Sequence, residues 1–257
     1  MRPLKGAEEI SASGLRRLII RIGGREKQGK TTWTLTAPPP IAYYDLNNRS
    51  KHVLDRFVGR GVWHYKYDML LAREQVEWKA VWNKLRKDFD EGVMHPDVRT
   101  LVIDTETDMW ELRRLAQWGR ESSVPDQYGA LNKDIRNMYD AVINSDKNLI
   151  VVSEMKKSYK TKIVRTKSGE RELSEWDGTY EFAGWSNAGA KVEVNLEACF
   201  DTKEHVFSTT VLNCGVNALL AGHVFEGAES NFPFLASAVF EDTDPGFWGY
   251  DEYVSGL

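Results

Sequence analysis

A short segment near the N-terminus, Gly24 to Thr31, has the residue types and the spacing of a loop that binds phosphate groups. It matches the pattern G-x-x-x-x-G-K-[ST] at every fixed position. Glycines let the backbone turn tightly enough for successive N–H groups to point at a phosphate chain, and the following helix adds its positive dipole end. Lys30 would reach the β and γ phosphates, and the Thr31 hydroxyl would hold Mg²⁺. The segment predicts nucleotide binding, with ATP and Mg²⁺ as cofactors and with these contacting residues: Gly24, Arg25, Glu26, Lys27, Gln28, Gly29, Lys30, Thr31 and Thr32.

The elements around this loop are the ones that the motif requires. Residues 18–22 read as a buried strand, and residues 30–35 can begin a helix, which gives the order strand, loop, helix. The alternative is an ordinary glycine-rich turn, and this order argues against it.

A later strand supplies a carboxylate for the metal that accompanies bound phosphates. Residues 100–104 form an apolar run that ends in Asp104. A phosphate-bound Mg²⁺ takes a carboxylate from the end of a neighbouring strand, so we expect Asp104 to act with Thr31 as a metal ligand. The alternative is that Asp104 caps the next helix.

Hydrolysis also needs a group that orients and deprotonates the attacking water. Asp45 and Glu106 both lie just past strand ends, on the side of the sheet where ligands of open α/β folds bind. Either one could instead be a solvated loop carboxylate. Glu154 follows the apolar strand 148–152 and is placed to sense the γ phosphate or to couple it to the next loop. The sequence leaves the choice between Asp45 and Glu106 open.

A basic segment follows Glu154, with Trp176 and Tyr180 just beyond it. Single-stranded nucleic acid is held by cations along its phosphates and by aromatic rings that stack on its bases. We predict that a hairpin or loop at 156–185 binds single-stranded DNA; the alternative is a solvated hairpin whose charges only keep it soluble. The predicted contacts are Lys156, Lys157, Tyr159, Lys160, Lys162, Arg165 and Lys167.

Composition places these motifs in a soluble globular α/β protein. The chain has 257 residues, 42% hydrophobic and 28% charged, with a net charge of −4 that gives no overall attraction to nucleic acid. Two cysteines are too few for a zinc site or a disulfide framework, and the chain has no long apolar stretch, so a cytoplasmic setting without membrane contact is expected.

Strands that alternate with helices predict a mostly parallel sheet covered on both faces. We expect an N-terminal arm at 1–15, an ATPase domain at 16–240, and an acidic, aromatic tail at 241–257 that is either flexible or packed.

These motifs together resemble the RecA-like ATPase core, and more closely the small phage-encoded ATPases of single-strand annealing and recombination. The resemblance rests on the phosphate loop, the Asp104 strand, residues 152–154 with the basic segment, and residues 212–217 with 231–234. It implies a RecA-type fold with a C-terminal β-rich extension, assembly into a homo-oligomeric ring or filament, and ATP-linked binding of single-stranded DNA in a host cytoplasm. A single-strand-binding protein or another replication or recombination protein would be a further partner.

The sequence departs from that family at two positions. RecA-like proteins typically carry Asp-x-Glu after the second strand, where this chain has Asp45-Leu46-Asn47. Asn47 can orient a water but cannot take its proton, so hydrolysis is expected to be slow or to use Glu106 or Asp45. Glu154 stands where the family has a polar amide, which puts the coupling to DNA in question.

Two other function classes stay open at the level of sequence. Asp45 with Arg49 faintly resembles the acceptor site of nucleoside kinases, but no arginine-rich lid follows. A nucleotide-gated interaction module, such as a helicase loader, would use the basic segment to contact protein instead of DNA.

Overall fold

The apolar runs of the first half of the chain form short, buried strands in the computed structural model, which describes residues 16–69, 71–119, 128–166 and 169–255. Every residue is buried in the four central strands, which are β1 (Ile19–Gly23), β2 (Ile41–Asp45), β4 (Thr100–Asp104) and β5 (Asn148–Val152). β3 (Val62–Lys66) is half-buried, as expected for a strand at the sheet edge. The predicted N-terminal arm, 1–15, lies outside the described residues.

The sheet has eight strands in the order β10-β9-β8-β1-β5-β4-β2-β3. All neighbours from β3 to β8 (Val194–Asp201) run parallel, whereas β9 (Val206–Cys214) and β10 (Val224–Glu226) are antiparallel additions. The predicted fold is confirmed in its architecture, a mostly parallel sheet with helices on both faces and a C-terminal β-rich extension. β8 and β10 were not expected from the sequence.

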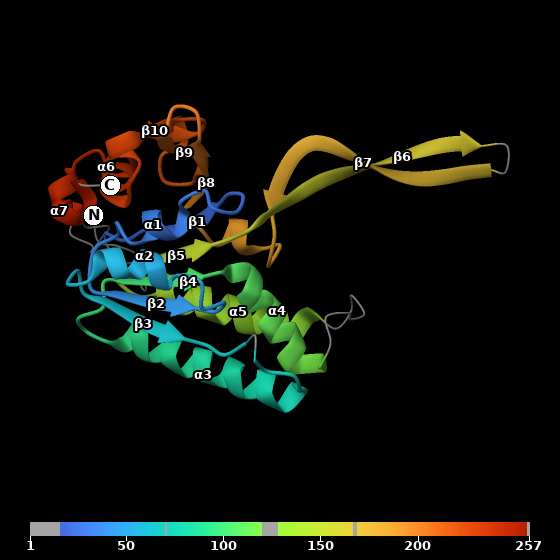
Figure 1. The fold of residues 1–257 in the computed structure, drawn as a ribbon, viewed down its shortest axis with the longest axis horizontal. Coiled ribbons are helices and arrows are strands. Elements are labelled where there is room, and N and C mark those ends of the chain that lie inside the picture. The colour runs from blue at the N-terminus through green and yellow to red at the C-terminus, as the bar shows by residue number, and fades with distance from the viewer. Residues whose placement is uncertain (1–15, 70, 120–127, 167–168, 256–257) are drawn as a thin grey trace, which may run out of the picture.

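Helices cover both faces of the sheet because alternate strand residues point to opposite sides. On one face, α3 (Gln75–Met94), α4 (Glu106–Trp118) and α5 (Tyr128–Ile143) bury an apolar stripe against Ile19, Ile103 and Val151 (Figure 1). On the other face lie α1 (Lys30–Thr34) and α6 (Phe232–Val239), which pack on Ile20 and Ile150. The shorter helical elements are α2 (Lys51–Leu54), η1 (Asp55–Phe57), η3 (Ala188–Ala190), η4 (Ala218–Leu220), η5 (Gly227–Glu229), η6 (Pro245–Trp248) and α7 (Glu252–Ser255). None of the helices in the described ranges combines the length and the apolar character needed to cross a bilayer.

The acidic, aromatic C-terminal segment packs onto the body as far as residue 255. Trp248 is fully buried between Phe232 and Phe240, with ring centroids 5.9 and 5.6 Å away. Asp251 forms an ion pair with the buried Arg60 at 2.5 Å. The sequence left open whether this segment is a flexible tail or a packed arm, and in the structure it is a packed arm.

A long two-stranded hairpin leaves the body directly after β5. It consists of β6 (Met155–Thr166) and β7 (Gly169–Phe182), which pair with each other and not with the main sheet. Figure 1 shows the hairpin as an arm that projects away from the domain. The basic segment thus lies on a protruding element whose root adjoins the end of a central strand.

Candidate functional site

The phosphate loop lies between β1 and α1, as the motif requires. Gly29 has a φ of 75°, in the left-handed region that favours glycine. A Cβ on Gly24 would lie 2.6 Å from the carbonyl oxygen of Ala198, so a side chain there would clash with β8. Both fixed glycines are therefore required by backbone geometry and by close packing.

A cavity of about 440 Å³ opens above this loop at the carboxyl ends of the strands. Its volume falls within the range of about 300–1,000 Å³ that is usual for small-molecule sites. It brings together most of the predicted nucleotide ligands with Asp104, Asn47 and Glu154. Its lining residues are Gly24, Arg25, Glu26, Lys27, Lys30, Thr31, Asn47, Arg49, Ser50, Asp104, Thr105, Glu154 and Met155.

The proposed metal ligands meet directly in this cavity. The Thr31 hydroxyl donates a hydrogen bond to Oδ2 of Asp104 over 2.8 Å. The Tyr43 hydroxyl donates to the same oxygen, a contact that the sequence did not suggest. Burial raises the pKa of the Asp104 carboxyl, and these hydrogen bonds oppose the rise. A hydroxyl beside a carboxylate is the oxygen donor set that Mg²⁺ takes when phosphates and waters complete its shell, so the pair fits this ion.

Lys30 is folded back onto the loop. Its ammonium donates to the carbonyl oxygens of Gly24 and Arg25, each over 2.8 Å. Burial lowers the pKa of Lys30, whereas the negative charges of Asp104 and Glu154 act to raise it. The ammonium is thus held at the cavity wall by weak neutral acceptors, which a phosphate oxygen can replace with a stronger, charge-assisted bond.

Asp45 is the last residue of β2 and Asn47 follows the strand, and the two have different surroundings. Asp45 is 1% exposed; it accepts hydrogen bonds from Ser50 and contacts His64 Nε2 at 3.0 Å. Asn47 lines the cavity, and its Nδ2 donates to Asp108 over 3.1 Å, which fixes the amide. Asn47 therefore faces the cavity, whereas Asp45 is buried and bonds within the fold.

Glu106 does not line the cavity, because its carboxylate points into the protein interior. It is fully buried and pairs with Arg21 at 2.7 Å, and it accepts from Ser153 Oγ over 2.6 Å. Burial raises the pKa of Glu106, and Arg21 opposes the rise. Arg21 and Ser153 both contact Oε2, and the Tyr139 hydroxyl donates to Oε1 over 3.4 Å. Because both oxygens have partners in the interior, we do not assign Glu106 the activation of water. An arginine inside the apolar run of β1 was the sequence signal for this buried pair.

Glu154 is, with Glu26, one of two exposed carboxylates that line the cavity among the described residues, and it is the last residue before the hairpin. Its backbone N–H donates to Thr107 Oγ1 over 3.2 Å, and its carbonyl accepts from Ala183 N over 2.8 Å. Phe182 packs over Gly23, where a Cβ would lie 2.4 Å from its ring. The guanidinium of Arg21 lies 4.4 Å from the centroid of the same ring. The root of the hairpin is thus in contact with the end of β1, directly before the phosphate loop.

The two faces of the hairpin differ in chemistry. Directly paired residues share a face, so Tyr159 and Trp176 lie together, both exposed, with Lys157 stacked 5.0 Å from the Trp176 ring centroid. On the opposite face, Lys156 pairs with Glu181 at 3.2 Å and Lys162 pairs with Glu175 at 3.5 Å; Lys160 also lies directly opposite Glu175.

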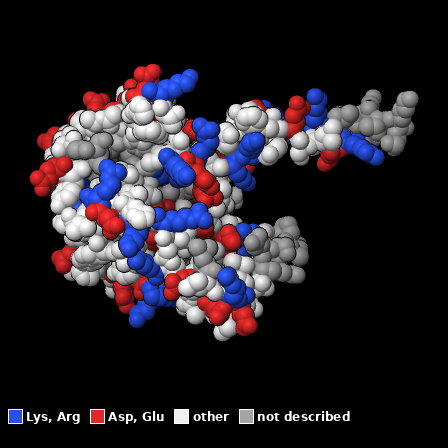
Figure 2. All heavy atoms as spheres, in the orientation of Figure 1, with Lys and Arg blue, Asp and Glu red and all other residues white. Residues whose placement is uncertain are grey.

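Acidic residues of β7 balance most of the positive charge that the sequence places on β6. Between Met155 and Phe182 the chain has seven basic and five acidic residues. Figure 2 shows blue and red side chains next to one another along the arm. Of the other predicted DNA contacts, Arg165 is a residue of strand β6, and Lys167 lies outside the described residues. The strand pairing therefore leaves the aromatic face as the most distinctive surface of the hairpin.

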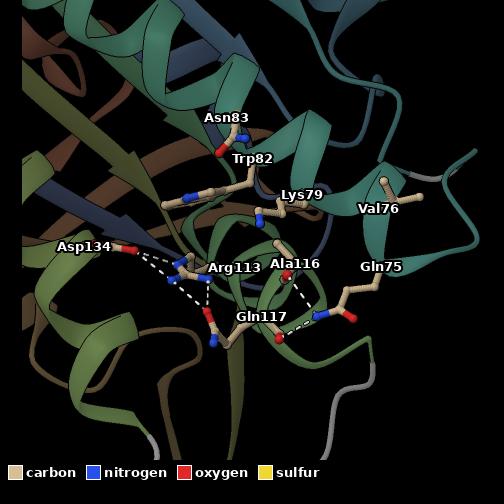
Figure 3. Close-up of a pocket in the computed structure, with 9 residues that line it drawn as sticks. All are labelled: Gln75, Val76, Lys79, Trp82, Asn83, Arg113, Ala116, Gln117 and Asp134. Atoms are coloured by element: carbon tan, nitrogen blue, oxygen red, sulfur yellow. Dashed lines mark hydrogen bonds and ion pairs between the residues drawn. The ribbon is translucent and has the colours of Figure 1, made fainter.

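A separate cavity of about 620 Å³ lies among α3, α4 and α5 and shares no lining residue with the site above (Figure 3). The buried Arg113 dominates it. Its Nε donates to Asp134 over 2.9 Å, its Nη1 donates to Gln117 over 3.1 Å, and its guanidinium lies 5.5 Å from the Trp82 ring centroid. These contacts join the three helices and engage the cation within the fold, so we assign this cavity no ligand.

Comparison with known protein families agrees with the presence of a phosphate loop. A family model described as an AAA domain (AAA_24) matches residues 16–211. No curated protein sequence matches the chain significantly. Among solved structures, the RadB recombinase is similar with a TM-score of 0.47 and 11% identity, over 81% of this chain and 86% of that one. A prototypical ATPase from the type III secretion system of pathogenic bacteria has a TM-score of 0.45 and 10% identity, over 73% of this chain and 52% of that one. Because the family model spans well over half of the chain and includes the phosphate loop, the chain belongs to this family of AAA domains.

Proposed function

We propose that this AAA domain binds Mg·ATP, hydrolyses it slowly, and uses the β6–β7 hairpin to hold single-stranded DNA in recombination or strand annealing of the phage type. One observation carries the proposal: Glu154, the last residue before the hairpin, and Met155, its first residue, both line the phosphate cavity. A ligand in the cavity and a ligand on the arm would therefore act on the same few residues.

For hydrolysis we assign the attacking water to Asn47 and Glu154. Both line the cavity, and Asn47 is fixed by Asp108. Asn47 orients the water but takes no proton, and Glu154 offers an exposed carboxylate that can accept one or sense the γ phosphate. Asp45 is buried beneath the loop with Ser50 and His64, which suits a supporting role.

For DNA, we assign the stacking of bases to the exposed face with Tyr159 and Trp176, beside Lys157. Lys156, Lys160 and Lys162 contribute the phosphate contacts, although the ion pairs of Lys156 and Lys162 have to rearrange for this. Those ion pairs favour one other candidate, a nucleotide-gated interaction module whose arm meets a protein. In either case we expect a homo-oligomer, a ring or a filament, with single-strand-binding or replication proteins as further partners.

Turnover measurements test the proposal. ATP hydrolysis is measured with and without single-stranded DNA, for the wild type and for Lys30→Ala. We expect DNA to raise turnover, and Lys30→Ala to weaken ATP binding about 10- to 150-fold, because it removes charge-assisted bonds worth about 1.5–3 kcal/mol.

The controls separate the candidate functions. Lys79→Ala, a surface lysine outside the phosphate cavity, should bind ATP like the wild type. If DNA neither binds nor changes turnover while ATP still binds, the DNA assignment fails and the interaction module stands. Transfer of phosphate to a nucleoside would overturn both in favour of a kinase.

A further inference from the structure

A second cavity, of about 460 Å³, lies on the other side of the first turn of α1. Its lining includes Gly29, the N-cap of α1, then Thr32 and Trp33 within the helix, and Thr36 just beyond its end. Lys30 and Thr31, between them in the chain, face the phosphate cavity instead. The loop and the first turn of α1 are therefore the wall between the two cavities.

The far wall of this second cavity is aromatic. Phe200 and Phe207, both half-buried, come from the facing ends of β8 and β9, and His205 lies 6.4 Å from Phe200 between ring centroids. The Phe207 ring lies directly against Gly29, where a Cβ would come within 2.8 Å of its Cε2. Gln28 of the phosphate loop accepts a hydrogen bond from the backbone N–H of Phe200, which ties this wall to the loop.

We propose that this cavity holds the ribose and base of the bound nucleotide, with the base stacked on Phe207. The inference rests on the proposed function, since it concerns the same triphosphate. A triphosphate on the loop, with its β and γ groups at Lys30, continues past Thr32, and that residue opens into the aromatic cavity. Every base has a π face, and larger rings stack over more area, so the site favours purine over pyrimidine triphosphates.

Polar side chains of this cavity contribute little to recognition of the edge of the base. Ser230 shares a hydrogen bond of 2.9 Å with Thr209, so its hydroxyl is already engaged. Arg56 and His205 are exposed lining residues at the ends of their elements. Stacking therefore sets affinity here, and we expect ATP and GTP to bind similarly and CTP more weakly.

The test compares Mg·ATP, Mg·CTP and Mg·tripolyphosphate by isothermal titration of the full chain. Tripolyphosphate reports the phosphate loop alone, and the affinity ratio of ATP to tripolyphosphate reports the base cavity. We expect the wild type to prefer ATP over tripolyphosphate at least about tenfold, the scale of one stacked base. Phe207→Ala should reduce that ratio toward one with tripolyphosphate binding unchanged, while Phe207→Tyr should retain it.

Control variants distinguish failure of the base-cavity proposal from misfolding and from failure of the proposed function. Phe247→Ala removes an exposed phenylalanine from outside the cavity and should keep the wild-type ratio. Phe200→Ala repeats the test if Phe207→Ala does not fold, because tripolyphosphate binding in the same variant shows an intact loop. Equal ratios in wild type and both cavity variants would overturn the base cavity alone. Failure of the wild type to bind either ligand would overturn the proposed function itself.

Discussion

Asp104 combines two demands that conflict within a folded chain. In its proposed role as a metal ligand it has to be ionised, yet it is 6% exposed and burial raises its pKa. Its neighbour in the register, Asp45, adds a further negative charge that acts in the same direction. The hydroxyls of Thr31 and Tyr43 offset part of this cost. Mg²⁺ bound as proposed would offset much more and would therefore stabilise the folded protein.

This conflict predicts that Asp104→Asn stabilises the free protein. A carboxyl whose folded pKa is raised binds its proton more tightly in the folded state, so its contribution to stability is fully present below the ordinary pKa of 3.8 and is lost as the pH rises through the folded value. At neutral pH we expect the variant to be more stable by roughly 0.5–2 kcal/mol, the size of typical stabilising substitutions. Urea unfolding of both proteins without nucleotide, from pH 4 to pH 8, measures the difference. It should grow with pH, and Mg·ATP should stabilise the wild type more than the variant; a difference independent of pH would contradict the argument.

Among the elements, the β6–β7 hairpin presents two surfaces that would bind different things. The aromatic face offers stacking, and the opposite face offers lysines already paired with glutamates. Ion pairs between exposed side chains contribute only about 0–1 kcal/mol, so a phosphate backbone can displace them.

The two faces predict different effects of substitution. Trp176→Ala should weaken single-stranded DNA binding by about 1–3 kcal/mol and leave the salt dependence unchanged, because it removes stacking and no phosphate contact. Leu173→Ala is the matched control, since Leu173 is exposed to a similar extent but pairs with Lys162 on the opposite face. Fluorescence anisotropy with a labelled oligonucleotide at several salt concentrations gives both quantities. Equal losses in the two variants would show that the aromatic face does not contact the bases.

Whether these elements can be predicted from sequence depends on whether the contacts that define them join residues that are near or far apart in the chain. The phosphate loop and the central strands follow from local pattern, and so does the position of Asp104. β8 does carry a local signal, because Val194, Leu196 and Ala198 alternate with polar residues, the period-two pattern of a strand with one buried face. Its parallel pairing with β1 is a long-range contact that this pattern does not predict. The burial of Glu106 depends on Arg21, far away in the chain, and the charge balance of the hairpin depends on its register.

At the scale of the whole molecule, the cavity and the arm are joined through a small root. Phe182 at the end of β7 packs on Gly23 before the phosphate loop and lies over Arg21. Arg21 in turn bonds Ser153, at 2.9 Å, and Glu106. Strand β1, the end of β5, the start of α4 and the return of the hairpin are thereby tied together. A change in the loop on nucleotide binding has a direct packing route to the arm.

We predict that Phe182→Ala uncouples the two ligands. Single-stranded DNA affinity is measured with and without a non-hydrolysable ATP analogue, and ATP affinity is measured with and without DNA. Coupling between sites is typically 5- to 150-fold, about 1–3 kcal/mol, and it has to be equal in both directions. In the wild type we expect a factor in this range, and in Phe182→Ala a factor close to one, with each ligand still binding alone.

Phe247→Ala, which removes an exposed phenylalanine remote from the root, should couple like the wild type. Full coupling in Phe182→Ala would mean that the nucleotide acts on the arm by another route, such as a neighbouring copy in an oligomer, and a dependence of the coupling factor on protein concentration would then identify that route.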